Sequence, residues 1–207
     1  IADMAIGGLL MEIASRPLPR KMVERRQPAG VDIAGVLLAA GMSSRMGDSN
    51  KLLVEIDGMP MVRHAAQAML AGGIEDLVVV TGHQAPAIEA ALSGLNLRFA
   101  HNPDFADGQS CSVAAGIAAM PASASGALIA LGDMPYLSAD LVAEMVQDHA
   151  RLGDHNTRIS FPVYDGKRGN PVLWGSGFFK ALQDLTGDIG GREILAAHPA
   201  AVNSITW

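Results

Sequence analysis

Residues 36–51 (Val-Leu-Leu-Ala-Ala-Gly-Met-Ser-Ser-Arg-Met-Gly-Asp-Ser-Asn-Lys) join an apolar run to a small, glycine-containing loop that carries Arg45 and ends at Lys51. Small residues let a backbone approach a ligand closely, and freed N–H groups together with two cationic side chains can bind phosphates. The segment therefore predicts a triphosphate site. Its nucleotide-binding candidates are Leu38, Ala39, Ala40, Gly41 and Ser43.

The spacing of this loop excludes the two commoner phosphate-binding loops. Gly41 and Gly47 have five residues between them, and no Gly-Lys-Ser/Thr follows, so the segment is not a Walker A loop. Gly41-Met-Ser-Ser also lacks the Gly-x-Gly-x-x-Gly pattern of a dinucleotide-binding turn.

The loop resembles the signature Leu-Ala-Ala-Gly-x-Ser-x-Arg-Met-Gly, followed by a lysine, of the MobA-like nucleotidyltransferases, and it is most similar to the molybdenum cofactor cytidylyltransferases within them. Three further segments occur in the order of that family: residues 132–135 (Gly-Asp-Met-Pro), 168–174 (Arg-Gly-Asn-Pro-Val-Leu-Trp) and 187–192 (Gly-Asp-Ile-Gly-Gly-Arg). The resemblance covers roughly residues 33–207. It implies a Rossmann-like α/β fold and the transfer of CMP from CTP to the terminal phosphate of a molybdenum-bearing pterin, with release of pyrophosphate.

Nucleotidyl transfer needs cations and alignment rather than a strong base, because charge repulsion dominates its barrier. The resemblance therefore makes Arg45, Lys51 and Asp133 the catalytic candidates, with Asp133 holding Mg²⁺, for which Mn²⁺ is an alternative. Asp188 is the second metal-binding candidate. The plainer interpretations are solvated charges for Arg45 and Lys51, a turn residue for Asp133 and a helix cap for Asp188.

Base and acceptor recognition also follow from the resemblance. Cytidylyltransferases of the cofactor carry Leu-Ala-Ala-Gly where guanylyltransferases carry Leu-Ala-Gly-Gly, so Ala40 favours the smaller cytosine. The remaining nucleotide-binding candidates are Thr81, Gly82, Asn102, Ser110 and Ser112, and the acceptor-binding candidates are Arg168, Asn170 and Arg192.

Several alternatives stay open at this point. One is a guanylyltransferase for the same cofactor, a second is a cytidylyltransferase for a sugar or polyol phosphate, and a third is a cofactor carrier without catalytic activity. A molybdoenzyme or its chaperone is an expected partner that receives the product.

The composition fits an enzyme core and excludes some partners. Of 207 residues, 49% are hydrophobic and 17% are charged, which suffices for a sizeable core. A net charge of −6 argues against nucleic-acid binding, and no apolar run reaches the ~18 residues of a membrane span. One cysteine, Cys111, excludes an internal disulfide, and we expect a cytoplasmic protein.

The histidines and the cysteine give no sign of a metal centre or a nucleophile. No His-x-x-x-His or Cys/His spacing for zinc occurs. His64 and His149 fall in predicted helices and are interpreted as surface or boundary residues, and Cys111 is interpreted as a small packing residue.

The elements that must position these residues alternate between strand and helix. Continuous apolar runs at 36–39, 77–80 and 128–131 predict parallel strands buried on both faces. Helices are predicted over 61–70, 86–92 and, after a Ser138 cap, 139–152. Asp165-Gly166 predicts a β-hairpin. The order indicates a three-layer, mostly parallel sheet that binds its ligand at the carboxyl ends of the strands.

Two predictions concern domain limits. Residues 1–31 contain polar, Pro-, Gly- and Arg-containing stretches, so we interpret them as an N-terminal extension or linker, such as the tail of an upstream domain. Residues 32–207 are then the nucleotidyltransferase domain. Relatives continue with a strand and an Asp-x-Asp-Thr-Pro-like segment, which this sequence lacks before its last residue, Trp207.

Overall fold

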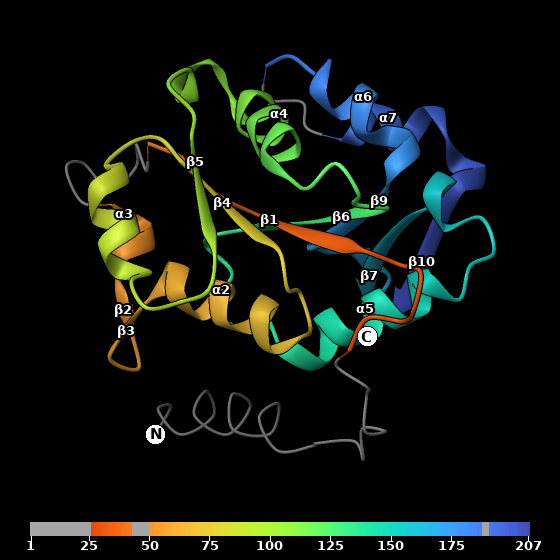
Figure 1. Cartoon of the computed structure of the whole chain (residues 1–207), viewed down its shortest axis with the longest axis horizontal. Coiled ribbons are helices and arrows are strands. Elements are labelled where there is room, and N and C mark those ends of the chain that lie inside the picture. Colours follow the sequence, from red (N-terminus) through yellow and green to blue (C-terminus); the bar gives the residue numbers. More distant parts are fainter. Residues whose placement is uncertain (1–25, 43–49, 188–190) are drawn as a thin grey trace, which may run out of the picture.

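Figure 1 shows the fold, a computed structural model in which residues 26–42, 50–187 and 191–207 are described. An eight-stranded sheet is flanked by helices. Its strands are β1 (Ile33–Ala39), β4 (Leu77–Thr81), β5 (Arg98–His101), β6 (Gly126–Leu131), β7 (Ile159–Tyr164), β8 (Lys167–Arg168), β9 (Val172–Gly175) and β10 (Val202–Thr206). A separate two-stranded sheet consists of β2 (Glu55–Ile56) and β3 (Met59–Pro60).

The helices connect the strands. The α-helices are α2 (Met61–Ala71), α3 (Ala85–Ala91), α4 (Gln109–Ala119), α5 (Ala139–Ala150), α6 (Phe179–Gln183) and α7 (Arg192–Ala197). The short 3-10 helices are η2 (Lys51–Leu53), η3 (Phe105–Asp107), η4 (His155–Thr157), η5 (Ser176–Phe178) and η6 (Pro199–Ala201).

The sheet has the order β10-β7-β9-β6-β1-β4-β5, with β8 paired to β7. Pairings are parallel between β1 and β4, β1 and β6, β4 and β5, and β7 and β10, whereas β9 is antiparallel to both β6 and β7. After β1 the chain proceeds through β4 and β5 on one side and then returns to β6 on the other side. The strand order therefore reverses between β1 and β6, which is where open α/β sheets bind ligands.

Two apolar layers enclose the sheet. Helices α2, α3 and α5 cover one face and helices α4, α6 and α7 cover the other (Figure 1). All seven residues of β1 are buried, as expected of a parallel strand covered on both faces. Helix α4 packs closely on the centre of the sheet, because a Cβ at Gly116 would lie 2.4 Å from Cγ1 of Val36. This close contact sets the distance between α4 and β1.

The three-layer α/β prediction is confirmed, and most predicted elements lie within one or two residues of the observed ones. Ser138 caps α5 by accepting a 3.1 Å hydrogen bond from the backbone N–H of Leu141. The predicted hairpin forms at Asp165-Gly166, where both residues have positive φ. Its partner strand is the short β8, while β9 returns to pair with β6 and β7. Strand β10 and helices α4, α6 and α7 were not predicted as elements.

The described part of the predicted linker contacts the domain. The side-chain amide of Gln27 makes two hydrogen bonds to the first residue of β1. It donates to the carbonyl of Ile33 at 2.8 Å and accepts from the N–H of Ile33 at 2.6 Å. The side chain of Gln147 donates to the carbonyl of Arg26 at 2.7 Å. The boundary at residue 31 stays a prediction, and residues 1–25 lie outside the described residues.

None of the helices in the described residues combines the length and the apolar character needed to cross a membrane.

Candidate active site

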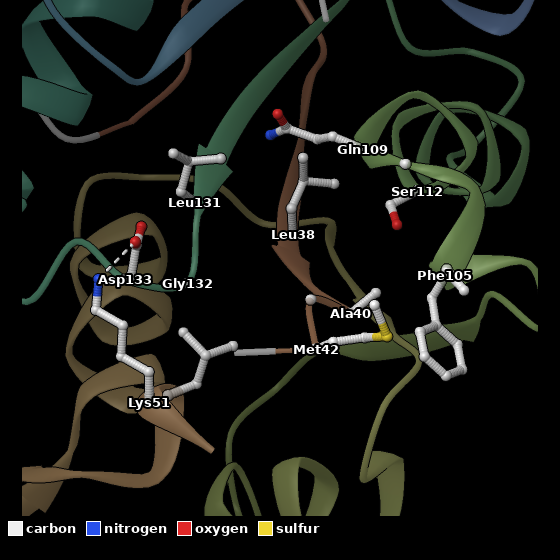
Figure 2. Close-up of a pocket in the computed structure, with 14 residues that line it drawn as sticks. Leu38, Ala40, Met42, Lys51, Phe105, Gln109, Ser112, Leu131, Gly132 and Asp133 are labelled. Atoms are coloured by element: carbon white, nitrogen blue, oxygen red, sulfur yellow. Dashed lines mark hydrogen bonds and ion pairs between the residues drawn. The ribbon is translucent and has the colours of Figure 1, made fainter. Parts of the chain in front are cut away.

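A hollow of about 450 Å³ opens at the carboxyl ends of β1 and β6 (Figure 2). We call it the nucleotide hollow, because the predicted nucleotide-binding residues Leu38, Ala40, Gly41 and Ser112 line it. Its walls come from the loop after β1, from η2, from the segment that leads into α4 and from the end of β6. The lining residues are Leu38, Ala40, Gly41, Met42, Lys51, Leu52, Phe105, Ala106, Gly108, Gln109, Ser112, Leu131, Gly132 and Asp133.

Lys51 and Asp133 meet at one side of this hollow. The Nζ atom of Lys51 donates to Oδ2 of Asp133 at 3.0 Å (Figure 2). Their side chains are 47% and 38% exposed, so both charges stay accessible to a ligand. An exposed ion pair contributes little to stability, about 0–1 kcal/mol. The pair is therefore better explained by what it can bind than by what it stabilises.

Backbone contacts place the two charges together. Gly132 extends the pairing of β6 with β1, because its N–H donates to the carbonyl of Leu38 at 2.9 Å. A Cβ at Gly132 would lie 3.1 Å from that same oxygen, so a larger residue would crowd the strand end. On the same side of the hollow, Asn50 caps η2 by accepting a 3.0 Å hydrogen bond from the N–H of Leu52. Buried Leu52 then fixes the adjacent Lys51 at the rim.

The start of α4 forms the opposite side of the hollow. Gly108 has φ 120°, a left-handed value that favours glycine, and α4 begins at the next residue. The N–H of Ser110 donates to the carbonyl of Gly187 at 3.2 Å, which ties the helix start to the Gly-Asp-x-Gly-Gly-Arg segment. A helix N-terminus favours anions, and this one borders the hollow beside Gln109 and Ser112.

Not all predicted nucleotide-binding residues line the hollow. Ser112 does, but Thr81 and Ser110 are fully buried, and neither hydroxyl has a hydrogen-bond partner among the described residues. Asn102 is also buried, and its amide donates to Oγ of Ser112 at 3.0 Å. In this placement Asn102 supports Ser112 rather than facing a base.

Two further predicted residues, Gly82 and Ala39, lie behind the surface of the hollow. Gly82 packs against it, since a Cβ there would lie 2.9 Å from the Cβ of Ala40 and 2.6 Å from the Cβ of Phe105. Ala39 is fully buried and packs on the other face of β1, among the residues of the α2 and α5 layer. These two small residues therefore shape the wall without contributing a contact surface.

A second hollow, of about 300 Å³, adjoins the first, and we call it the acceptor-side hollow. Each of the three predicted acceptor-binding residues, Arg168, Asn170 and Arg192, lines it. The rest of its lining is mainly apolar and comprises Leu38, Gln109, Val113, Ile129, Leu131, Val172, Trp174, Leu182, Gly191 and Leu195.

Aromatic rings contact two segments that line this second hollow. The guanidinium carbon of Arg168 lies 5.6 Å from the centroid of the Phe161 ring, a cation–π geometry that restrains the arginine. Gly191 approaches the Trp174 ring so closely that a Cβ would lie 2.4 Å from it. This contact gives a physical reason for a glycine directly before Arg192.

The two hollows share three residues: Leu38 at the end of β1, Leu131 at the end of β6 and Gln109 at the start of α4. A group bound in one hollow therefore lies directly beside a group bound in the other. Transfer between two bound molecules requires such an arrangement, because the reacting atoms must come within about 3–3.5 Å of each other.

Sequence reasoning missed Phe105, Met42 and Gln109 as lining residues. Phe105 and Gln109 lie in the segment between the predicted candidates Asn102 and Ser110, but no motif marked them individually. Met42 follows Gly41 in the loop and could have been inferred from its position. The predicted Ser43, Arg45 and Asp188 lie outside the described residues.

One histidine differs from its predicted setting. His149 is fully buried rather than at the surface, because α5 turns it toward β7, where its Nδ1 lies 2.8 Å from Oγ of Ser160. Burial, together with the smaller effect of the neighbouring His155, lowers the pKa of His149 from 6.5 to about 4. His149 lines neither hollow, so its role is structural.

Known proteins match this chain over most of its length. Residues 35–202 match the model of the MobA-like NTP transferase domain. A nicotine blue oxidoreductase from Paenarthrobacter nicotinovorans is 34% identical over 181 residues, which cover 84% of this chain and 86% of that protein. A probable molybdenum cofactor guanylyltransferase from Natronomonas pharaonis is 32% identical over 130 residues, or 62% of this chain and 61% of that protein.

The solved structures agree on the fold. A nucleotidyl transferase from Methanothermobacter thermautotroptrophicus superposes with a TM-score of 0.73 at 24% identity, covering 86% of this chain and 88% of that one. The family match extends from β1 to the start of β10 and includes both hollows. This chain therefore belongs to the family of MobA-like NTP transferase domains.

Proposed function

We propose that this chain is a cytidylyltransferase that transfers CMP from CTP to the terminal phosphate of a molybdenum-bearing pterin. The observation that carries the proposal is the meeting of two hollows, one bordered by Lys51 and Asp133 and the other by Arg168 and Arg192. The first suits a triphosphate and the second suits an anionic acceptor. We place the reaction in the cytoplasm, where nucleoside triphosphates are available.

The chemistry follows from this arrangement. An anionic oxygen of the acceptor phosphate attacks the α-phosphorus of CTP, the bond to the β-phosphate oxygen breaks, and pyrophosphate leaves with the electron pair. No proton needs to be removed from an ionised phosphate. Lys51 would offset the charge on the triphosphate as it grows toward the leaving group, and the start of α4 would add its N–H groups on the other side.

The residues present fit a bound Mg²⁺, with Mn²⁺ as an alternative. Asp133 offers a partly exposed carboxylate, a hard oxygen ligand, at the wall of the nucleotide hollow. Among the described residues there is no cluster of three or more acidic, histidine or cysteine side chains. Mg²⁺ takes one or two protein carboxylates and completes its shell with phosphates and water. When bound, the ion would neutralise charge on the phosphates.

Asp188 remains the proposed second carboxylate. Its neighbour Gly187 contacts the start of α4 through the 3.2 Å hydrogen bond to Ser110. The Gly-Asp-x-Gly-Gly-Arg segment thus begins beside the nucleotide hollow and ends at Arg192 in the acceptor-side hollow.

The acceptor-side hollow favours a pterin phosphate over a sugar or polyol phosphate. Its apolar residues are Val113, Ile129, Val172, Trp174, Leu182 and Leu195, and they offer a surface on which a fused ring system can pack. A ring body with one phosphate directed toward Arg168 and Arg192 matches this lining better than an open polyol chain.

Two other activities have specific support. The similarity to the Natronomonas guanylyltransferase favours GTP as an alternative donor for the same acceptor. The similarity to nicotine blue oxidoreductase favours a redox reaction, in which the nucleotide hollow would hold a reduced dinucleotide and the acceptor-side hollow a dye-like ring system. Such a reaction would release no pyrophosphate.

One assay series separates these candidates. Purified protein is incubated with each of the four nucleoside triphosphates and Mg²⁺, with and without the molybdenum-bearing pterin, and pyrophosphate release is measured. Parallel reactions follow oxidation of reduced nicotinamide dinucleotides with nicotine blue. We expect pyrophosphate release that needs both CTP and the pterin. Dye reduction without pyrophosphate release would replace the transferase proposal with the redox one, and inactivity in both assays would favour a carrier.

A further inference from the structure

The wall shared by the two hollows contains one polar side chain. Leu38 and Leu131 are aliphatic, whereas Gln109 carries an amide. Figure 2 shows its side chain extending from the start of α4, with the amide turned toward Leu38 and Leu131. Gln109 is exposed, so this amide is accessible to ligands in both hollows.

We propose that Gln109 is a catalytic residue that contacts the α-phosphoryl group as it passes from the nucleotide to the acceptor. This inference rests on the proposed nucleotidyl transfer. In that reaction a new bond forms between an acceptor oxygen and the α-phosphorus while the bond to pyrophosphate breaks. The α-phosphoryl group must then lie where the two hollows meet, which is beside Gln109.

The chemistry of an amide suits this position. The NH₂ group can donate hydrogen bonds to the non-bridging oxygens of the α-phosphoryl group, and it carries no charge that would bind the ground-state triphosphate strongly. A donor that gains strength as charge develops lowers the barrier rather than the affinity for the substrate. Gln109 is therefore expected to affect turnover more than nucleotide binding.

The local structure holds this residue in place. Gln109 is the first residue of α4, between Gly108, whose left-handed backbone starts the helix, and Ser110, whose N–H is bonded to the carbonyl of Gly187. Helix α4 in turn is packed on β1 through Gly116. The amide is thus carried by a rigid element, as alignment of a transfer reaction requires.

The test compares Gln109→Ala and Gln109→Glu with the unchanged protein. We expect Gln109→Ala to lower kcat about 10²-fold, the size of effect typical for loss of one transition-state hydrogen-bond donor, with KM for CTP changed less than threefold. Gln109→Glu keeps the shape but places a negative charge beside the phosphates, so it should lower kcat further. Gln183→Ala, an exposed glutamine of α6 that lines neither hollow, is the matched control and should keep normal kinetics.

Stability measurements separate catalysis from structure. An acidic residue in the first turn of a helix interacts favourably with the helix dipole, so Gln109→Glu should have an unchanged or higher Tm while being the least active variant. Binding of a non-hydrolysable CTP analogue to Gln109→Ala should match that of the unchanged protein. Normal kcat in both variants, or losses of kcat that parallel losses of Tm, would overturn the assignment of Gln109 alone. Absence of pyrophosphate release from the unchanged protein would instead overturn the proposed function, and this inference with it.

Discussion

Lys51 and Asp133 are 82 positions apart in the chain, yet the Nζ atom of Lys51 donates a 3.0 Å hydrogen bond to the Asp133 carboxylate. Parallel pairing of β1 with β6 brings them together, because each residue follows the carboxyl end of one of these strands. In the proposed reaction a triphosphate and its cation would each take one partner of this pair.

Removal of the cationic partner tests the phosphate site. Lys51→Ala should lower kcat for pyrophosphate release by about 10²- to 10³-fold, since Lys51 is proposed to offset charge that grows in the transition state. Circular dichroism should show an unchanged fold, because the ion pair is exposed. Lys180→Ala, which breaks the exposed Lys180–Asp184 pair on α6, is the matched control. Near-normal kcat of Lys51→Ala at saturating CTP would remove Lys51 from the site.

Removal of the carboxylate tests the metal site. Asp133→Asn keeps the shape of the side chain but loses its charge, so Mg²⁺-dependent activity should collapse and added Mn²⁺ should restore little. Asp184→Asn is the control, and Asp188→Asn should have a weaker effect than Asp133→Asn. Activity is measured as a function of Mg²⁺ concentration. Full activity of Asp188→Asn would assign Asp188 a capping role instead.

Base selection is tested at Ala40. Ala40→Gly should raise kcat/KM for GTP relative to CTP, although one methyl group discriminates by only about 1–3 kcal/mol. We expect a shift near the lower limit of that range, because the Cβ of Ala40 packs toward Gly82 and Ala40 is 3% exposed. Ala34→Gly, at the other end of β1, controls for the added backbone freedom. An unchanged ratio would mean that base choice depends on other groups of the nucleotide hollow.

The acceptor-side hollow is tested at Gly191. A Cβ added by Gly191→Ala would meet the Trp174 ring, so the ring or the backbone at residue 191 must shift, and both line the hollow. We expect KM for the pterin to rise several-fold while KM for CTP stays constant. Gly153→Ala is the control, since a Cβ at Gly153 would meet no atom within 4 Å. Equal changes in both KM values would indicate that the two hollows do not bind separate substrates.

The pH dependence of stability is tested at His149. Its pKa is lowered to about 4 in the folded state, whereas an unfolded chain has the usual 6.5. The unfolded state therefore binds the proton more tightly, so the free energy of unfolding should fall between about pH 6.5 and pH 4, by up to roughly 3 kcal/mol from this group. Urea unfolding at pH 7 and pH 5 measures this change.

A variant assigns the pH effect to the residue. His149→Gln should flatten the dependence between pH 7 and pH 5, although it lowers stability at pH 7 by disturbing the contact with Ser160. His101→Gln, at an exposed position of β5, should leave the dependence unchanged. An equal pH dependence in the His149 variant and the unchanged protein would exclude this histidine as its source.

The sequence by itself determined the three-layer fold and the edge of the sheet where ligands bind. Apolar runs such as 77–80 identify strands buried on both faces, because polar residues there would be desolvated without partners. Asp133 lies just after the apolar run 128–131, and Lys51 ends the loop that follows the run 36–39. Parallel strands bring their carboxyl ends to one edge of the sheet. Their proximity therefore followed from topology alone, as did the grouping of Arg168 with Arg192 from motif order.

Only the tertiary structure decided which residues near that edge reach a ligand. Thr81, Ser110 and Ser112 were all predicted to bind the nucleotide. The direction of β4 buries Thr81 and the rotation of α4 buries Ser110, whereas Ser112 lines the hollow. Gln109 lies between the two hollows because α4 begins directly after Gly108. One residue along a helix turns a side chain by about 100°, since 3.6 residues make a turn, so these orientations depend on packing that local sequence patterns do not record.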